Sequence, residues 1–129
     1  MEWFVQQFEE QSGILCTLET KNTVSRYNKE VNTTMYRIFQ EAMTNVMRHS
    51  KATKVDILLF EENKHLVLEI LDNGKGITES EESNNLSLGI TGMKERATML
   101  NGSFLLKKRK GGGTRLKVLV PLSVEIENK

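Results

Sequence analysis

The chain has 129 residues, of which 38% are hydrophobic, and this length and composition suit one domain with a single buried core. Its 18 Lys and Arg against 17 Asp and Glu leave a net charge of +1, so no basic field indicates nucleic acid and no acidic excess indicates disorder. One cysteine, Cys16, excludes an intrachain disulfide and suits a reducing, cytoplasmic compartment, and no apolar run is long enough to cross a bilayer.

The first segment, "MEWFVQQFEEQSG", predicts a short helix. Phe4 and Phe8 are one helical turn apart, and Gly13 follows where a left-handed cap ends a helix. A strand is then expected from about Ile14 to Glu19.

A long helix and a hairpin are expected next. Asn32 follows a polar, turn-rich stretch and can cap a helix that runs to about His49. Apolar residues recur in this helix at helical spacing, at Met35, Phe39, Ala42, Met43 and Val46. "KVDILLF" and "HLVLEIL" then predict two strands joined by a tight polar turn at residues 62 to 64, and Asp72 ends the second strand.

The second half of the chain predicts a loop, a helix and a second pair of strands. Residues 78 to 88, "TESEESNNLSL", offer almost nothing to bury, so we expect a mobile loop there. The helix that follows has apolar residues on one face, at Ile90, Met93, Ala97 and Leu100. Gly102 lies just past its end, where a C′ glycine belongs, and "SFLLKKRKGGGTRLKVLVPL" predicts two strands around a glycine turn.

The order of these elements indicates the fold class. A helix, a strand, a helix, two strands, a loop, a helix and two strands follow one another without an internal repeat or a second linker. We therefore predict an α+β fold, a two-layer sandwich in which helices cover one face of a mixed sheet.

Polar residues on the long helix form a first candidate site. Glu41 and Asn45 are four residues apart and stack on one face, with Arg48 three residues further along. A solvated polar face normally lies on the side of a helix opposite its apolar stripe. These residues lie beside the stripe instead, so we expect them to border a cleft. An asparagine oxygen suits Mg²⁺, which keeps several waters when phosphate oxygens supply other ligands, and a carboxylate one turn away can orient such a water. Taken alone, an ordinary exposed helix edge is the better interpretation.

The stretch "ILDNGKGI" places Asp72 at the end of a strand, before two glycines. Asp72 can simply cap the turn at Asn73 and Gly74, which is common turn chemistry. Alternatively, its carboxylate can accept a hydrogen bond from an exocyclic amino group such as that of adenine. Gly74 and Gly76 would then let the backbone approach the base. From these residues alone, the two interpretations are equally supported.

The stretch "SLGITGM" places Gly89 and Gly92 at the start of the second long helix. Backbone N–H groups at a helix start can bind phosphate, although a flexible hinge is the simpler reading. Gly74 and Gly76 lack the third glycine of a dinucleotide fingerprint, and no P-loop occurs. The basic run from Lys107 to Lys110 is best explained as a solvated hairpin end. His65 has no metal-ligand partner nearby in sequence and is read as structural.

These motifs occur in one order along the chain. "QEAMTNVMRHS", "DNGKGI", "SLGITGM" and "GGGT" together resemble the nucleotide-binding domain of sensor histidine kinases, in which the first three are the N, G1 and G2 boxes. The resemblance covers residues 32 to 122 and is closest to kinases of the nitrate/nitrite-sensor type. It implies the Bergerat ATP-binding sandwich shared with gyrase, Hsp90 and MutL.

The resemblance implies an adenine site around the G1 box. Asp72 would read the adenine amino group, and Gly74 and Gly76 would shape the floor of the pocket. Thr114 would support Asp72 through a water molecule, and Ile77 would also contact the nucleotide.

It also implies a site for the phosphates and for Mg²⁺. Asn45 would bind the metal, and Glu41 would be the catalytic residue that orients a metal-bound water or assists proton removal from the acceptor. Residues 78 to 88 would be the ATP lid. The remaining nucleotide-binding residues would be His49, Gly89, Gly92 and Met93.

One feature of complete histidine kinases is missing from the sequence. Their phosphoacceptor histidine lies on a separate two-helix dimerisation domain, and neither His49 nor His65 is placed to be that acceptor. The resemblance therefore implies a catalytic fragment, with residues 1 to 13 ending a linker helix and residues 14 to 129 forming the ATP-binding domain. Its expected partners are the dimerisation domain of the same kinase and a response regulator. The cytoplasmic fragment itself would be monomeric.

Three alternatives stay open. An anti-sigma-factor serine kinase uses the same sandwich and has about this length. A non-catalytic nucleotide-sensing module would have no need of Glu41 and Asn45 together. A nucleic-acid binder acting through Lys107 to Lys110 would depend strongly on salt, and the net charge of +1 counts against it.

Overall fold

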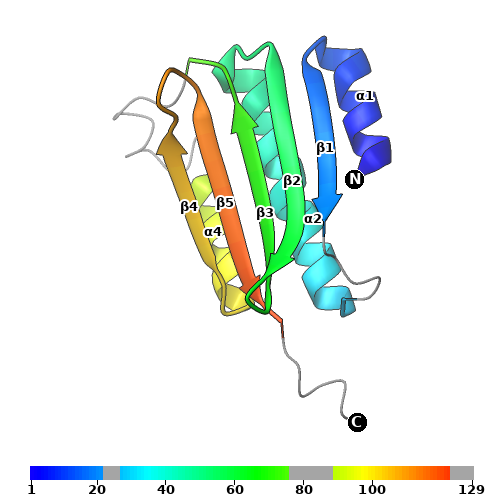
Figure 1. The fold of residues 1–129 in the computed structure, drawn as a ribbon, viewed down its shortest axis with the longest axis vertical. Helices are drawn as coiled ribbons and strands as arrows, with labels where there is room; N and C mark the ends of the chain where they lie inside the picture. The colour runs from blue at the N-terminus through cyan, green and yellow to red at the C-terminus, as the bar shows by residue number, and fades with distance from the viewer. Residues whose placement is uncertain (22–26, 76–88, 123–129) are drawn as a thin grey trace.

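The computed structural model describes residues 1–21, 27–75 and 89–122, and for residues 49 and 50 the backbone alone. Five strands form one mixed sheet, and α2 and α4 lie together behind it (Figure 1). The helices are α1 (Glu2–Ser12), α2 (Lys29–Asn45), η1 (Val46–Ser50) and α4 (Ile90–Met99), and the strands are β1 (Leu15–Lys21), β2 (Lys54–Glu62), β3 (His65–Asp72), β4 (Ser103–Lys108) and β5 (Thr114–Pro121). The strand order is β1-β2-β3-β5-β4, with β1 parallel to β2 and every other pair antiparallel. The predicted α+β sandwich is confirmed.

The N-terminal helix forms as predicted and packs on α2. Gly13 has φ 74° and its N–H donates to the carbonyl of Glu9 at 2.9 Å, which is a left-handed helix cap. The Phe4 ring meets Phe39 of α2 edge-on, with centroids 5.1 Å apart. Strand β1 begins at Leu15 and extends to Lys21, because its parallel pairing with β2 continues past the predicted end.

The long helix begins earlier than predicted. Its N-cap is Asn28, whose side-chain oxygen accepts from the N–H of Val31 at 2.8 Å, and Asn32 lies inside the first turns. Both asparagines precede apolar helical residues, but Val31 is itself buried, so the apolar face starts at Val31, one turn before Met35. At the other end, η1 adds one π-helical turn and carries the helix to Ser50, close to the predicted end at His49.

The hairpin of β2 and β3 is confirmed, and it fixes the position of Asp72. Asn63 and Lys64 have φ of 52° and 61°, the conformation of a two-residue type I′ loop. The register pairs Val55 with Asp72, so Asp72 is the last residue of β3 and projects to the same face of the sheet as Val55. That face is the one covered by helices.

The end of α4 differs from the prediction in one residue. The left-handed residue is Asn101, with φ 60°, and Gly102 follows it. The N–H groups of Asn101 and Gly102 donate to Thr98 and Ala97, both at 2.8 Å, which is the Schellman arrangement. Glycine is needed at position 102 for another reason, because a Cβ there would overlap the main-chain oxygen of Leu119.

The core lies between the sheet and the helices. Ile38, Phe39 and Met43 of α2 are fully buried, and burying a side chain of this size contributes about 1.5–3 kcal/mol. Facing them are Ile57, Leu68 and Val118 from three adjacent strands. Among the described residues, no helix is long and apolar enough to span a membrane.

Candidate functional site

The described site residues form two pairs of neighbours, Asp72 with Thr114 and Glu41 with Gly89. The end of β3 and the end of α2 lie at the upper end in Figure 1, opposite the β2–β3 turn, and α4 begins lower down, behind the sheet. Asp72 and Thr114 are direct partners across β3 and β5. The N-box residue Glu41 and the G2-box residue Gly89 therefore come together from separate elements, and the G1-box residue Asp72 lies at the end of a third.

Asp72 is a buried carboxylate at the edge of this region. It is 5% exposed, and burial raises its pKa, while the N–H groups of Gly74 and Thr114 and the charge of Arg109 lower it. The Gly74 N–H donates to Oδ1 of Asp72 at 2.9 Å, so the turn-capping interpretation is confirmed as geometry. A carboxylate has roughly four lone-pair sites, so this bond leaves capacity for a ligand donor.

Asn73 holds the turn after Asp72 against β2. Its Oδ1 accepts from the N–H groups of Thr53 and Lys54 at 2.9 and 3.0 Å, and its Nδ2 donates to the Thr53 hydroxyl at 2.9 Å. Sequence reasoning treated Asn73 only as a turn residue. The contact crosses about 20 residues of chain, and no local pattern indicates it.

The glycine turn between β4 and β5 packs directly on Asp72. Gly111, Gly112 and Gly113 all have positive φ, from 92° to 118°. A Cβ on Gly113 would overlap the main-chain oxygen of Asp72, so only glycine lets the two backbones approach this closely. Thr114, which follows, is buried beside Asp72.

Glu41 of α2 lies against Gly89 at the start of α4. Gly89 has φ 68°, and a Cβ built on it would lie 2.5 Å from the Oε2 atom of Glu41. The bare Cα thus makes room for the carboxylate at the first turn of α4. Asn45, one turn after Glu41, is half-buried on the same side of α2.

Similarity to known proteins agrees with this arrangement. Residues 30–124 match the sequence model of the histidine kinase-, DNA gyrase B- and HSP90-like ATPases. The chain belongs to this ATPase family. Its resemblance to sensor histidine kinases is thereby confirmed at the level of the domain family.

Individual relatives of this ATPase-family domain are signalling proteins. It is 32% identical over 122 residues to the signal transduction histidine-protein kinase/phosphatase DegS of Brevibacillus brevis, covering 95% of this chain and 31% of DegS. It is 40% identical over 100 residues to the sensor protein VraS of Staphylococcus saprophyticus, covering 78% of this chain and 28% of VraS. The chain thus spans about a third of the length of these relatives.

The fold is shared with solved catalytic domains. The ATP binding domain of PrrB from Mycobacterium tuberculosis superposes with a TM-score of 0.71 at 19% identity, covering 92% of this chain and 91% of that one. The two-layer sandwich predicted from the motif order is therefore a known architecture of ATP-binding domains.

Two predicted residues on the first turn of α4, Gly92 and Met93, differ in their surroundings. Met93 is fully buried in the core beneath Gly89, whose carbonyl accepts its N–H at 3.1 Å. Gly92 lies on the first turn of α4, beside the Arg96 side chain. Gly76, Ile77, the predicted lid at residues 78 to 88 and the side chain of His49 lie outside the described residues.

The basic run on β4 and its turn is only partly a solvated hairpin end. Lys107, Lys108 and Lys110 are exposed, as predicted. Arg109 is not, because its Nη1 donates to the main-chain oxygen of Asp72 at 2.9 Å. His65 opens β3 at the other end of the sheet, and its Nδ1 lies 2.8 Å from the oxygen of Asn63, in agreement with a structural role.

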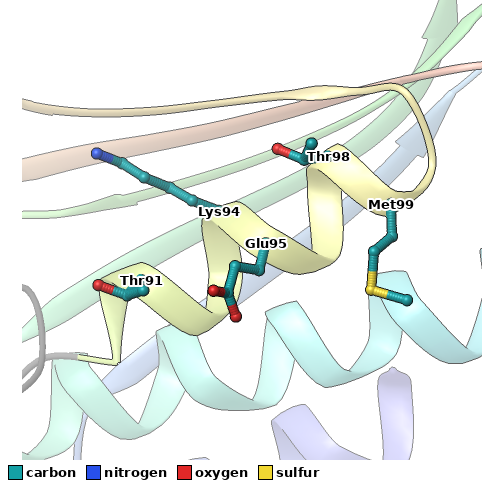
Figure 2. A pocket seen from close by; sticks show the side chains of 5 residues that line it. All are labelled: Thr91, Lys94, Glu95, Thr98 and Met99. Carbon is teal, nitrogen blue, oxygen red and sulfur yellow. The ribbon is translucent and has the colours of Figure 1, made fainter.

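Two surface hollows of this ATPase-family domain do not include its main predicted site side chains. One, of about 510 Å³, runs along α4, and Figure 2 shows its side chains spaced along the helix with Lys94 and Glu95 pointing to opposite sides. The other, of about 470 Å³, is lined mainly by apolar side chains around Tyr27, Met35 and Leu59, toward the N-terminal end of α2. Neither includes Glu41, Asn45 or Asp72.

Replacing Gly89 tests the assignment of this residue to nucleotide binding. Gly89→Ala should lower the free energy of unfolding by about 1–2 kcal/mol because its φ is positive, and should also displace the Glu41 carboxylate. Gly13→Ala is the matched control, since Gly13 has φ 74° but nothing within 4 Å of the added Cβ. Chemical denaturation should show similar losses for both, whereas nucleotide titration should show weaker binding for Gly89→Ala alone. Equal binding by the two variants would contradict the assignment.

Proposed function

We propose that this chain is the catalytic ATP-binding domain of a two-component sensor histidine kinase, which donates the γ-phosphoryl group of ATP to a histidine on a separate dimerisation domain. The observations that carry the proposal are the packing of Glu41 against Gly89 and the pairing of Asp72 with Thr114 across β3 and β5. ATP with Mg²⁺ needs a metal ligand, an acceptor for the adenine amino group and a binding site for the phosphates. We assign these roles to Asn45, Asp72 and Gly89.

The adenine base is assigned to the Asp72 region. A buried carboxylate that keeps free lone pairs can accept a hydrogen bond from the N6 amino group. Gly74, with Gly76 and Ile77 beyond it, would form the floor of the pocket, and Thr114 supports Asp72 from β5. Guanine would be refused, because it presents a carbonyl oxygen to the carboxylate.

The phosphates and Mg²⁺ are assigned to the other side of the site. Asn45 offers one neutral oxygen, a donor that suits a metal whose other ligands are phosphate oxygens and water. Glu41 lies on α2, one turn before Asn45, and its carboxylate packs against Gly89 at the start of α4. There it would orient a water or accept a proton from the phosphoacceptor histidine. When bound, the metal neutralises charge on the phosphates. Gly89, Gly92 and His49 complete the assigned nucleotide-binding residues, and Met93, fully buried in the core, is assigned to the packing under the first turn of α4.

The wider context follows from the same proposal. We assign residues 1 to 13, which contain α1, to the end of a linker helix, and residues 14 to 129 to the catalytic domain, in the cytoplasm. Its partners would be the dimerisation domain of the same kinase and a response regulator in a phosphorelay. The narrower nitrate/nitrite-sensor type rests on the motif resemblance alone, since DegS and VraS are other sensor proteins.

The isolated chain should bind ATP with Mg²⁺ but not phosphorylate itself. Positioning supplies most of the catalysis in phosphoryl transfer, so a histidine away from the site is not an acceptor. His65 begins β3 and Asp72 ends it, which separates them by roughly 24 Å along the strand. Calorimetric titration with ATP and Mg²⁺ should show binding, and incubation with labelled ATP should leave the chain unlabelled. Acid-labile label on His49 or His65 would overturn the proposal.

A further inference from the structure

Arg109 makes a contact that the ATP-binding motifs do not explain. Its three lysine neighbours in the basic run are exposed, whereas its own guanidinium turns back to the main-chain oxygen of Asp72, with Nη1 at 2.9 Å. Holding an arginine in one conformation costs rotamer entropy, which a hydrogen bond from a charged group can offset.

The turn that carries Arg109 is itself firmly closed. The Arg109 N–H donates to the carbonyl of Gly113 at 2.9 Å, and the Arg109 carbonyl accepts from the N–H of Gly112 at 3.1 Å. Gly113 also packs on the main-chain oxygen of Asp72, where a Cβ would not fit. The turn therefore contacts the main chain of Asp72 twice, through the guanidinium of Arg109 and through the Cα of Gly113.

Two further contacts restrict the position of the Asp72 backbone. Thr114 pairs with Asp72 on β5, and Asn73 is bonded to the start of β2. An aspartate has only two side-chain torsions, and the Gly74 N–H holds Oδ1 of Asp72 at 2.9 Å, so the direction of its carboxylate follows the placement of its main chain. We infer that Arg109 is a positioning residue for nucleotide selection, which anchors the main chain of Asp72 so that its carboxylate faces the amino group of adenine. The inference rests on the proposed function and deepens it.

The charge of Arg109 acts in the same direction as its hydrogen bond. Burial raises the pKa of Asp72, and the nearby guanidinium lowers it, which favours the carboxylate needed to accept a hydrogen bond. Val55 and Thr114, the partners of Asp72 on β2 and β5, carry no charge. Removing the guanidinium should therefore raise the pKa of Asp72 further. Protonation would then weaken adenine binding at a higher pH than in the wild type.

Comparing two nucleotides distinguishes recognition of the adenine amino group from electrostatic attraction of the triphosphate. The chain is titrated with ATP and with purine riboside 5′-triphosphate, which lacks the amino group, each with Mg²⁺. Arg109→Met should weaken ATP binding about three- to tenfold and the second nucleotide much less, because only ATP uses the positioned carboxylate. Lys110→Met is the matched control, since it removes one positive charge from the same turn and should affect both nucleotides alike.

A double-mutant cycle tests whether Arg109 acts through Asp72. In an Asp72→Asn background, Arg109→Met should cause no further loss of ATP binding. Equal loss for the two nucleotides, or a full additional loss in the Asp72→Asn background, would overturn the inference and leave Arg109 as a source of charge or stability. A wild type that binds neither nucleotide would instead refute the proposed function.

Conservative variants keep the test valid if Arg109→Met does not fold, as judged by circular dichroism. Arg109→Lys keeps the charge and Arg109→Gln keeps a donor without the charge. The acid-side fall in ATP affinity should move to higher pH in Arg109→Gln and stay near the wild-type position in Arg109→Lys. An unchanged pH profile in both variants would contradict the electrostatic part of the argument.

Discussion

Asp72→Asn should weaken ATP binding by roughly ten- to a hundredfold, since a hydrogen bond to a charged group contributes about 1.5–3 kcal/mol. The amide is nearly isosteric, and its oxygen can still accept from the Gly74 N–H, so the turn should persist. The loss should be specific to adenine, whereas GTP, which wild type binds weakly, should bind the variant at least as well, because the amide N–H can donate to the guanine carbonyl oxygen. Titrations of both nucleotides into both proteins measure this directly.

The stability of the same variant gives an independent check. Burial raises the pKa of Asp72, so its ionised form opposes folding, and that unfavourable contribution is absent at low pH and appears as the pH rises through the raised pKa. At neutral pH, Asp72→Asn should therefore unfold at the same or a higher denaturant concentration than wild type. Asp56→Asn, on the opposite face of the sheet, is a control that should leave ATP binding unchanged. A folded Asp72→Asn variant that binds ATP like wild type would reduce Asp72 to a turn residue.

Glu41→Gln should have the largest effect on phosphoryl transfer. With the dimerisation domain supplied, the rate of histidine phosphorylation should fall by roughly 10²–10⁴-fold, the range for loss of a group that moves or orients a proton. The neutral amide has the shape of the carboxylate, so the packing against Gly89 should survive. The affinity for ATP should change by no more than about threefold, because the group acts mainly in the transition state.

A second glutamate on the same helix controls for the loss of charge. Glu30 lies exposed in the first turn of α2, at the end away from the site. Glu30→Gln should leave both the transfer rate and ATP affinity close to wild type. If Glu41→Gln transfers phosphate as fast as Glu30→Gln, then Glu41 is an ordinary helix-edge residue, which was the better interpretation of its sequence context alone.

Helices and strands whose apolar residues recur at a regular spacing were predictable from the sequence. The apolar faces of α2 and α4 and the β2–β3 hairpin were expected and confirmed, because side-chain burial at fixed spacing determines them. Element ends were less predictable. Asn28 and Asn32 carry the same capping signal, and the burial of Val31, which decides between them, depends on tertiary packing.

The candidate site was predictable as a set of motifs but not as a set of contacts. Each motif alone had an ordinary alternative, and only their order gave the family resemblance that the match over residues 30–124 confirms. The contact between Glu41 and Gly89 joins segments 48 residues apart in sequence, and no local pattern encodes it. Arg109 was interpreted as solvated for the same reason, because its partner is a backbone oxygen on another strand.

Transfer to a defined acceptor tests the central claim most directly. The chain is incubated with labelled ATP and Mg²⁺, together with either the histidine-bearing dimerisation domain of its own kinase or a serine-bearing antagonist protein of the anti-sigma-factor type. The account predicts acid-labile label on the histidine of the dimerisation domain and none on the antagonist. Acid-stable label on the serine protein, or no label on the dimerisation domain from a chain that binds ATP, would contradict it.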